Sequence, residues 1–186
     1  IKTSIGGYDI NSNPSYRISA FGTAQARRID YLYDTRFPGK PAKIKEPSVI
    51  NTSPGTACIE GTNCKVTNFG YDDTGNVTSL SINGFVPGGG VVSRTTSMQY
   101  NAKGQVVSID GPRTDAADVT TLSYYECSAG GACGQLRSIT NAAGHTTSFD
   151  SYDAAGRLTQ STDANGLRTS YSYDARGRVR FVTQSP

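Results

Sequence analysis

A four-residue turn motif occurs six times along this chain: an Asp or Asn, two small or polar residues, and a Gly. Asp or Asn at the first position of a type I turn accepts backbone hydrogen bonds, and Gly at the fourth position closes a hairpin in the left-handed conformation. From residue 141 onward the motif recurs every 10 to 12 residues, which leaves room for one short strand between turns. This spacing predicts an antiparallel hairpin array. The six turns are Asp72–Gly75, Asn101–Gly104, Asn141–Gly144, Asp153–Gly156, Asp163–Gly166 and Asp174–Gly177.

A tyrosine precedes four of the six turns, so the repeated unit is longer than the turn. Aligned on that tyrosine, the units read YDDTGNVTSL, YNAKGQVVSI, YDAAGRLTQS and YDARGRVRFV. Two degenerate copies, YDTRFPGKPAKI and YECSAGGACGQLRSI, carry extra residues within the turn. We expect the repeat tyrosines to stack as cross-strand pairs, with a sugar-binding surface as the alternative. They are Tyr33, Tyr71, Tyr100, Tyr125, Tyr152 and Tyr173.

The pattern Tyr-Asp-x-x-Gly followed by Arg, Asn or Gln and an aliphatic residue resembles the YD-repeat (Rhs) family. The resemblance covers residues 28–186 and is sharpest over 141–178. It implies antiparallel strands joined in a curved or spiralling strip that forms part of the wall of a hollow shell. Such shells occur in bacterial polymorphic toxins, in the cocoon component of insecticidal toxin complexes and in animal teneurins.

The same alignment divides the chain into two parts. Residues 1–27 form a lead-in segment with no clear repeat, and residues 28–186 form the repeat strip. Long or irregular stretches between repeats predict insertions near 47–66, 84–93, 110–119 and 127–133.

Composition favours strands over helices. Ser and Thr together number 41, and Asp, which favours turns, outnumbers the helix former Glu by 12 to 3. Only 35% of the residues are hydrophobic, so a sheet with hydroxyl side chains on one or both faces fits better than a thick aliphatic core. We therefore predict an all-β chain with at least about 40% strand and less than about 10% helix.

The charged residues suggest no nucleic-acid or membrane partner. The net charge is +3, and the densest basic stretch is Arg176, Arg178 and Arg180 beside Arg168. Alternate residues of a strand share a face, so these arginines are expected to form a solvated face, since nucleic-acid binding requires a larger basic footprint. No segment is long and apolar enough to span a membrane.

The four cysteines form two matching pairs, CIEGTNC and CSAGGAC. Each pair brackets five residues inside a predicted insertion, where a disulfide would close the neck of a loop. Zinc sites prefer two to four intervening residues, and reduced thiols are a further alternative. The favoured pairs are Cys58–Cys64 and Cys127–Cys133, and disulfides would imply an oxidising compartment.

No catalytic, cofactor-binding or metal site can be assembled from the motifs. His145, the only histidine, follows a turn and is expected to make a structural hydrogen bond rather than act as a base. The stretches DANG and DDTGN lack the closing Glu and the acid spacing of a calcium loop, so turn chemistry explains them better. No phosphate-binding, dinucleotide or hydrolase fingerprint appears.

These observations predict a non-enzymatic structural segment of a larger bacterial protein that is secreted or at the cell surface. Its partners would be other repeats of the parent, or copies of itself, paired through strand edges, with a possible enclosed effector. The toxin members of the family carry an Asp-Pro-x-Gly-type motif after the repeats, and its absence here implies an internal piece of wall. The alternative function is an extracellular adhesin or glycan-binding module that uses exposed Tyr and Thr faces.

Overall fold

Strands dominate the fold. The computed structural model describes residues 2–48, 53–85, 90–128 and 130–186, and about half of the chain lies in the fourteen strands of these ranges. The one helical segment among the described residues is a three-residue 3₁₀ turn, η1 (Gly130–Ala132). The predicted all-β antiparallel hairpin array is therefore confirmed.

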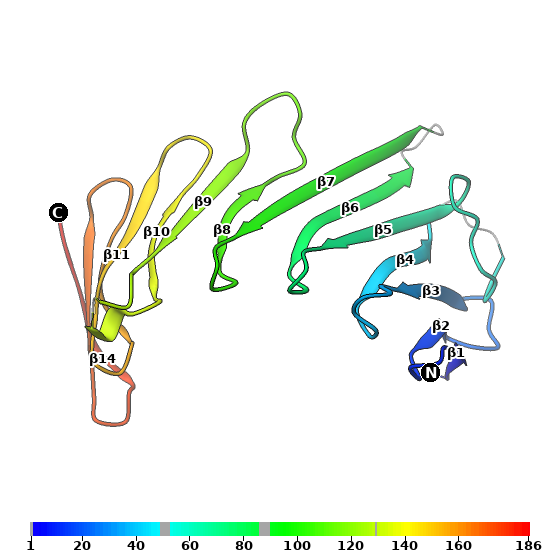
Figure 1. The fold of residues 1–186 in the computed structure, drawn as a ribbon, viewed down its shortest axis with the longest axis horizontal. Coiled ribbons are helices and arrows are strands. Elements are labelled where there is room, and N and C mark those ends of the chain that lie inside the picture. Colours follow the sequence, from blue (N-terminus) through cyan, green and yellow to red (C-terminus); the bar gives the residue numbers. More distant parts are fainter. Residues whose placement is uncertain (1, 49–52, 86–89, 129) are drawn as a thin grey trace. The chain divides into compact units, whose positions relative to one another are not determined.

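The chain divides into two compact units, residues 1–98 and 99–186. Strand order follows chain order, and each strand pairs antiparallel with its sequence neighbours within its unit (Figure 1). The first unit contains β1 (Thr3–Tyr8), β2 (Pro14–Ser19), β3 (Arg27–Tyr33), β4 (Pro41–Pro47), β5 (Cys64–Tyr71), β6 (Val77–Phe85) and most of β7 (Val91–Tyr100). The second contains β8 (Val106–Asp110), β9 (Val119–Tyr124), β10 (Leu136–Thr140), β11 (Thr146–Tyr152), β12 (Leu158–Thr162), β13 (Arg168–Tyr173) and β14 (Val179–Ser185).

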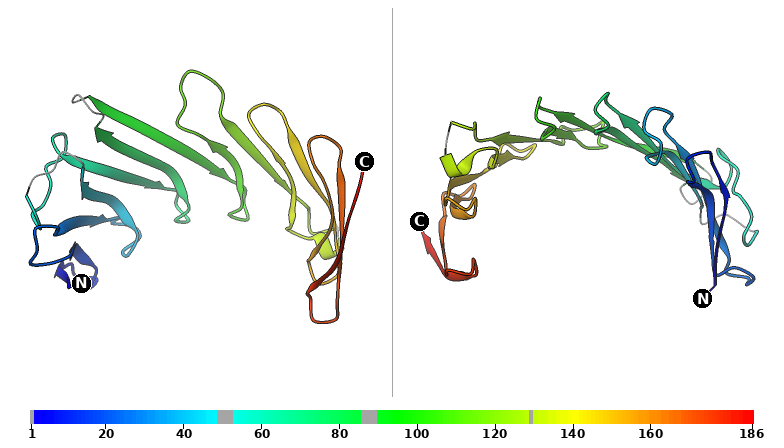
Figure 2. Two further views of the ribbon diagram at one scale, coloured as in Figure 1. Left: turned by 180° about the vertical axis from the view of Figure 1, so that it is seen from behind. Right: turned by 60° about the horizontal axis from the view of Figure 1, so that its bottom comes forward.

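Each unit is a single layer of strands, as the right-hand view of Figure 2 shows. Few side chains are therefore buried. The one buried hydrophobic cluster in the described ranges consists of Cys58, Cys64 and Val66 in the first unit, which are 4%, 2% and 2% exposed. Hydrogen bonds and cross-strand pairs consequently carry more of the stability than they do in a two-layer domain.

The strand register of the second unit sorts side chains by chemistry. Facing residues share a face of the sheet, and one face collects hydroxyl groups. Two facing hydroxyl pairs are hydrogen-bonded, Ser123–Ser138 at 2.7 Å and Thr140–Thr146 at 2.8 Å between oxygens. A third bond, of 2.7 Å, joins Ser151 to Thr159 at an irregularity in the β11–β12 register. Leu122 and Ile139 face each other on the opposite side. The expected hydroxyl-rich sheet surface is thus present in this unit.

Three long connections and one long hairpin interrupt the regular spacing of the strands. Residues 48–63 join β4 to β5, 111–118 join β8 to β9, and 125–135 join β9 to β10. Near 84–93, the pairing of β6 with β7 continues as far as Gly84 facing Val92 and Phe85 facing Val91. Residues 49–52, 86–89 and 129, which fall in the predicted insertions, lie outside the described residues.

Candidate functional site: repeated turns and a tyrosine ladder

The six predicted turns share one set of hydrogen bonds. In the turn that begins at Asp153, the carboxylate Oδ1 accepts from the backbone N–H groups of Ala155 (2.9 Å) and Arg157 (3.0 Å). The N–H of Gly156 donates to the Asp153 carbonyl at 2.9 Å. The other five turns repeat these contacts, with Asn in place of Asp at positions 101 and 141. Their glycines lie at φ values from 75° to 87°, in the left-handed region.

A seventh turn of this kind lies in the lead-in segment, where no repeat was expected. Asp9 Oδ1 accepts from the N–H groups of Asn11 (2.9 Å) and Asn13 (2.8 Å), and Ser12 N–H donates to the Asp9 carbonyl at 3.0 Å. Ser12 occupies the glycine position with φ at 63°. The missing glycine hid the turn in the sequence, although the pair Tyr8-Asp9 was a usable signal.

The turns occupy both ends of the hairpins in the second unit. Consecutive antiparallel strands place successive turns at alternate ends, so Asn141 and Asp163 lie opposite the turns at Asp153 and Asp174. The latter two follow a tyrosine, whereas Asn141 and Asp163 do not. The repeat is therefore a pair of strands. Tyrosine marks the end of the hairpins at which the Asp153 and Asp174 turns lie, and we call this end of the sheet the tyrosine edge.

The repeat tyrosines bond backward to the preceding turn. The phenol of Tyr173, at the end of β13, donates to the carbonyl of Leu158, the first residue of β12, at 2.6 Å. Tyr152 donates to the corresponding Leu136 carbonyl of β10 at 2.7 Å. We call this series the tyrosine ladder: Tyr33 to Pro14, Tyr71 to Pro41, Tyr124 to Val106, Tyr152 to Leu136 and Tyr173 to Leu158.

Ring packing around the ladder varies more than the phenol hydrogen bond. Tyr152 packs edge to face against Tyr125 at 6.2 Å, and Tyr71 packs against Phe37 at 6.0 Å. Burial raises the pKa of the Tyr33, Tyr71 and Tyr152 phenols. The phenols thus stay protonated and can donate at physiological pH.

The tyrosine that follows the repeat pattern in β9 is Tyr124, whereas the sequence predicts Tyr125. Tyr124 makes the ladder bond, to the Val106 carbonyl at 2.8 Å, whereas Tyr125 takes the first turn position. The Gly134 N–H donates to the Tyr125 carbonyl at 3.0 Å, as the turn glycine does elsewhere. Two adjacent tyrosines and a long turn left this register ambiguous in the sequence.

Both cysteine pairs are disulfide-bonded in the structure, Cys58 to Cys64 and Cys127 to Cys133. The first bond closes part of the β4–β5 connection and belongs to the buried cluster. The second bond lies within the Tyr125 turn, and both of its cysteines are exposed. The two loops have the same length but very different surroundings.

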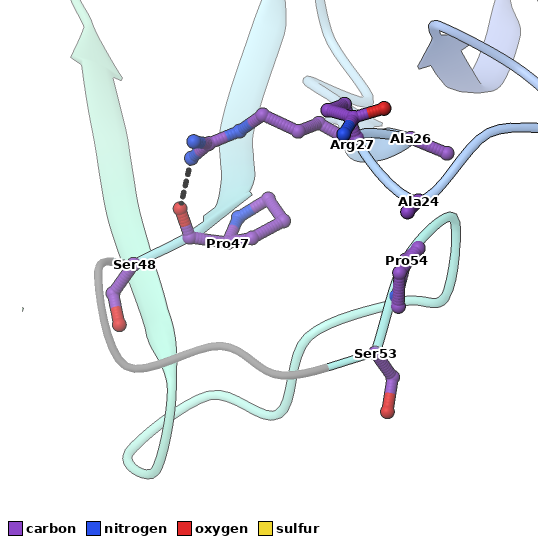
Figure 3. Close-up of a pocket in the computed structure, with 8 residues that line it drawn as sticks. Ala24, Ala26, Arg27, Pro47, Ser48, Ser53 and Pro54 are labelled. Atoms are coloured by element: carbon purple, nitrogen blue, oxygen red, sulfur yellow. Dashed lines mark hydrogen bonds between the residues drawn. The ribbon is translucent and has the colours of Figure 1, made fainter.

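Two further places were considered as sites, His145 and a pocket beside β3. His145 is exposed, and its backbone N–H donates to Asn141 Oδ1 at 3.0 Å. A pocket of about 310 Å³ lies beside β3 and β4 (Figure 3), where the Arg27 guanidinium is already hydrogen-bonded to the Pro47 carbonyl at 2.7 Å. Across the described part of the chain, no three His, Cys, Asp or Glu side chains gather closely enough to hold a metal ion.

Comparison with known families identifies the repeats. The family model described as RHS Repeat matches residues 134–167 and again residues 152–185. Each match covers three of the turns described above and at least one tyrosine of the ladder. Residues 134–185 are therefore Rhs (YD) repeats. The resemblance stated from the sequence is confirmed, and the structure adds that an Rhs repeat here comprises two strands, a tyrosine edge and a ladder bond.

Solved structures share the Rhs fold of this chain. The crystal structures of TcdB2-TccC3-Cdc42 and TcdB2-TccC3 match it with a TM-score of 0.56 and 18% sequence identity, over 98% and 99% of the chain. The Tc holotoxin pore of Photorhabdus luminescens matches over 98%, with the same TM-score and identity. The chain spans about a tenth of those proteins. No curated protein matches it in sequence. Over the described ranges, no helix is long and apolar enough to cross a membrane.

We expect the chain to lose folding stability in acid because the carboxylates of the Rhs turns become protonated there. Hydrogen bonds from the Asn76 and Thr74 side chains lower the pKa of Asp72 from 3.8 to about 2, and the turn hydrogen bonds lower the pKa of Asp153 and Asp174. A folded-state pKa below the unfolded value adds stability above about pH 4, which is lost as the pH falls toward 2. We expect the melting temperature to fall over this interval.

The variant Asp72→Asn tests the contribution of this one carboxylate. Asparagine serves the same turn position at 101 and 141 but does not titrate, so the variant's melting temperature should fall less between pH 5 and pH 2. Circular dichroism melts at closely spaced pH values measure the difference. Identical pH profiles for the two proteins would show that Asp72 does not contribute.

Proposed function

We propose that this chain is a non-enzymatic wall segment of a larger secreted or cell-surface Rhs protein, which encloses an effector or presents a rigid surface. The observation that carries the proposal is the tyrosine ladder. The phenols and turn carboxylates, which are the most reactive groups of the repeat, are committed to backbone hydrogen bonds. Groups used in this way hold neighbouring strands and turns together, which supports a structural role. The two disulfides support an oxidising destination.

The outer edge of β14 is suited to pairing with a further repeat. β14 is hydrogen-bonded to β13 on one side, and all seven of its residues are exposed. Val179, Phe181 and Val182 are 55–60% exposed. By the geometry of the ladder, the Val179 carbonyl corresponds to Leu158 and Leu136, so a following strand that ends in tyrosine would complete it. Exposed apolar edges of this kind template strand pairing.

Edge pairing predicts that the isolated chain associates as its concentration rises. Val182→Lys places a charge on the β14 edge strand, where it disfavours pairing with another strand, and should weaken association by at least about tenfold, or roughly 1.4 kcal/mol. Leu167→Lys, in the turn before β13, is the matched control because Leu167 is 36% exposed and lies outside the strands. Sedimentation velocity over a hundredfold concentration range measures both. A wild-type chain that stays monomeric throughout would refute edge pairing.

A glycan-binding adhesin is the competing function. Sugar platforms need exposed aromatic faces, and Tyr8 (62% exposed), Phe181 (60%) and Phe21 (51%) are the most exposed aromatic candidates. The ladder counts against the repeat tyrosines in this role, because their phenols donate to carbonyls. A glycan array probed with the wild-type chain and with Tyr8→Ala separates the functions, since only the adhesin gives signals that the variant loses.

A further inference from the structure

The two disulfides of this chain have the same sequence separation of six residues and opposite environments. Cys58 and Cys64 are 4% and 2% exposed and pack with Val66, whereas Cys127 and Cys133 are exposed at the tyrosine edge of the second unit. Attack by a thiolate requires access to a sulfur atom. We propose that Cys127–Cys133 is a redox modification site that exchanges with small thiols, while Cys58–Cys64 is a permanent structural crosslink.

A lysine selects which sulfur leaves. Lys103 Nζ lies 3.9 Å from Cys127 Sγ, and Lys103 comes from the neighbouring turn that begins at Asn101. A nearby ammonium stabilises a thiolate, and a more stable leaving thiolate departs faster. Glu126 lies 3.5 Å from the same ammonium and offsets part of this effect. The arrangement favours attack on Cys133, with Cys127 as the leaving group.

The exchange proceeds in two steps. A thiolate of the reductant attacks Cys133 Sγ, the bond between the two protein sulfurs breaks, and its electron pair remains on Cys127 Sγ beside Lys103. A second thiolate attacks the reductant sulfur of this mixed disulfide and releases Cys133 as a thiolate. The reductant becomes a disulfide, the protein gains two electrons, and the two cysteine thiolates take up protons from water according to their pKa values.

The closed loop connects three turns, so opening it has a structural effect. Gln105 Nε2, in the preceding turn, donates to the Gly134 carbonyl at 2.8 Å. On the other side, a Cβ on Gly131 would lie only 2.5 Å from the Asp153 carbonyl oxygen, which shows that η1 packs directly on the following turn. The Tyr125 phenol donates to the Phe149 carbonyl at 3.0 Å. Reduction would therefore loosen the tyrosine edge around this loop.

Timed reduction of the intact chain with dithiothreitol tests the assignment. After quenching with iodoacetamide, peptide mass spectrometry should show Cys127 and Cys133 labelled at least about ten times faster than Cys58 and Cys64. Lys103→Gln should slow the opening of Cys127–Cys133 by about two- to fivefold, and Lys103→Arg, which keeps the positive charge, should slow it less. Neither variant should change the rate at Cys58–Cys64, which is the internal control.

Hydrogen exchange reports the structural consequence. Reduction should raise amide exchange in the turns 101–105 and 153–157, and leave the turn 141–145 at the opposite edge unchanged. Equal labelling rates at the two disulfides, or faster labelling at Cys58–Cys64, would overturn the proposal. An unchanged rate in Lys103→Gln would remove Lys103 from it, and unchanged exchange in the adjoining turns would overturn the structural coupling.

Discussion

Replacing Cys58 and Cys64 together with serine should lower the free energy of unfolding of residues 1–98 by about 3–4 kcal/mol. A crosslink that closes a loop of seven residues contributes about 2.4 kcal/mol by restricting the unfolded chain. The substitutions also place two hydroxyl groups in the only buried cluster of the described residues, against Val66. Urea unfolding followed by circular dichroism measures the loss.

The pair Cys127→Ser and Cys133→Ser is the matched control for this effect. Its loop has the same length, but its cysteines are exposed. Serine hydroxyl groups at these positions remain hydrated, so their substitution carries no cost of burying a polar group. The expected loss is about 2 kcal/mol, confined to residues 99–186. Equal losses for the two double variants would show that burial around Cys58–Cys64 contributes nothing beyond the crosslink.

Tyr152→Ala should destabilise residues 99–186 by about 2–3 kcal/mol. The substitution removes a half-buried ring that packs on Tyr125 and a phenol that donates to the Leu136 carbonyl at 2.7 Å. Both contacts join elements of consecutive repeats, in a layer where few other side chains are buried. Urea unfolding, with hydrogen exchange to locate the change, measures the effect.

Tyr152→Phe separates the two contributions to this loss. It keeps the ring and removes the hydrogen bond, so a loss of about 1 kcal/mol is expected. Tyr8→Phe is the control, because Tyr8 is 62% exposed and precedes the first turn, and it should change stability by less than about 0.5 kcal/mol. If Tyr152→Phe and Tyr8→Phe have equal effects, the ladder bond does not stabilise the sheet.

The parts of this fold that could be predicted from sequence are those fixed by neighbouring residues. Asp or Asn with Gly three residues later specifies its own hydrogen bonds, and regular spacing of such turns leaves only a hairpin array. The Asp9 turn escaped because Ser12 replaces glycine, and the backbone there adopts φ of 63° without it. The Asp9 carboxylate still accepts the turn hydrogen bonds, so the preceding Tyr8 and Asp9 itself were the only local signals of this turn.

Features that depend on contacts between repeats could not be predicted. The repeated tyrosines were expected to stack, but their shared contact is a phenol that reaches a carbonyl of the neighbouring strand, as Tyr173 reaches Leu158. Sequence shows the period of a residue and not the direction of its side chain. The same limit applies to the disulfides, because CIEGTNC and CSAGGAC have the same spacing although only Cys58–Cys64 is buried.

The direction of the tyrosine ladder has a consequence for how the chain is made. Every ladder phenol reaches back 15 to 30 residues, to a strand that the ribosome has already released before the tyrosine itself emerges. Each repeat within a unit can therefore close onto its predecessor during translation, without waiting for distant sequence. Contacts of such short range favour rapid folding. An Rhs strip with this ladder can grow one hairpin at a time in the order of its synthesis, and each new strand is added beside the one made just before it.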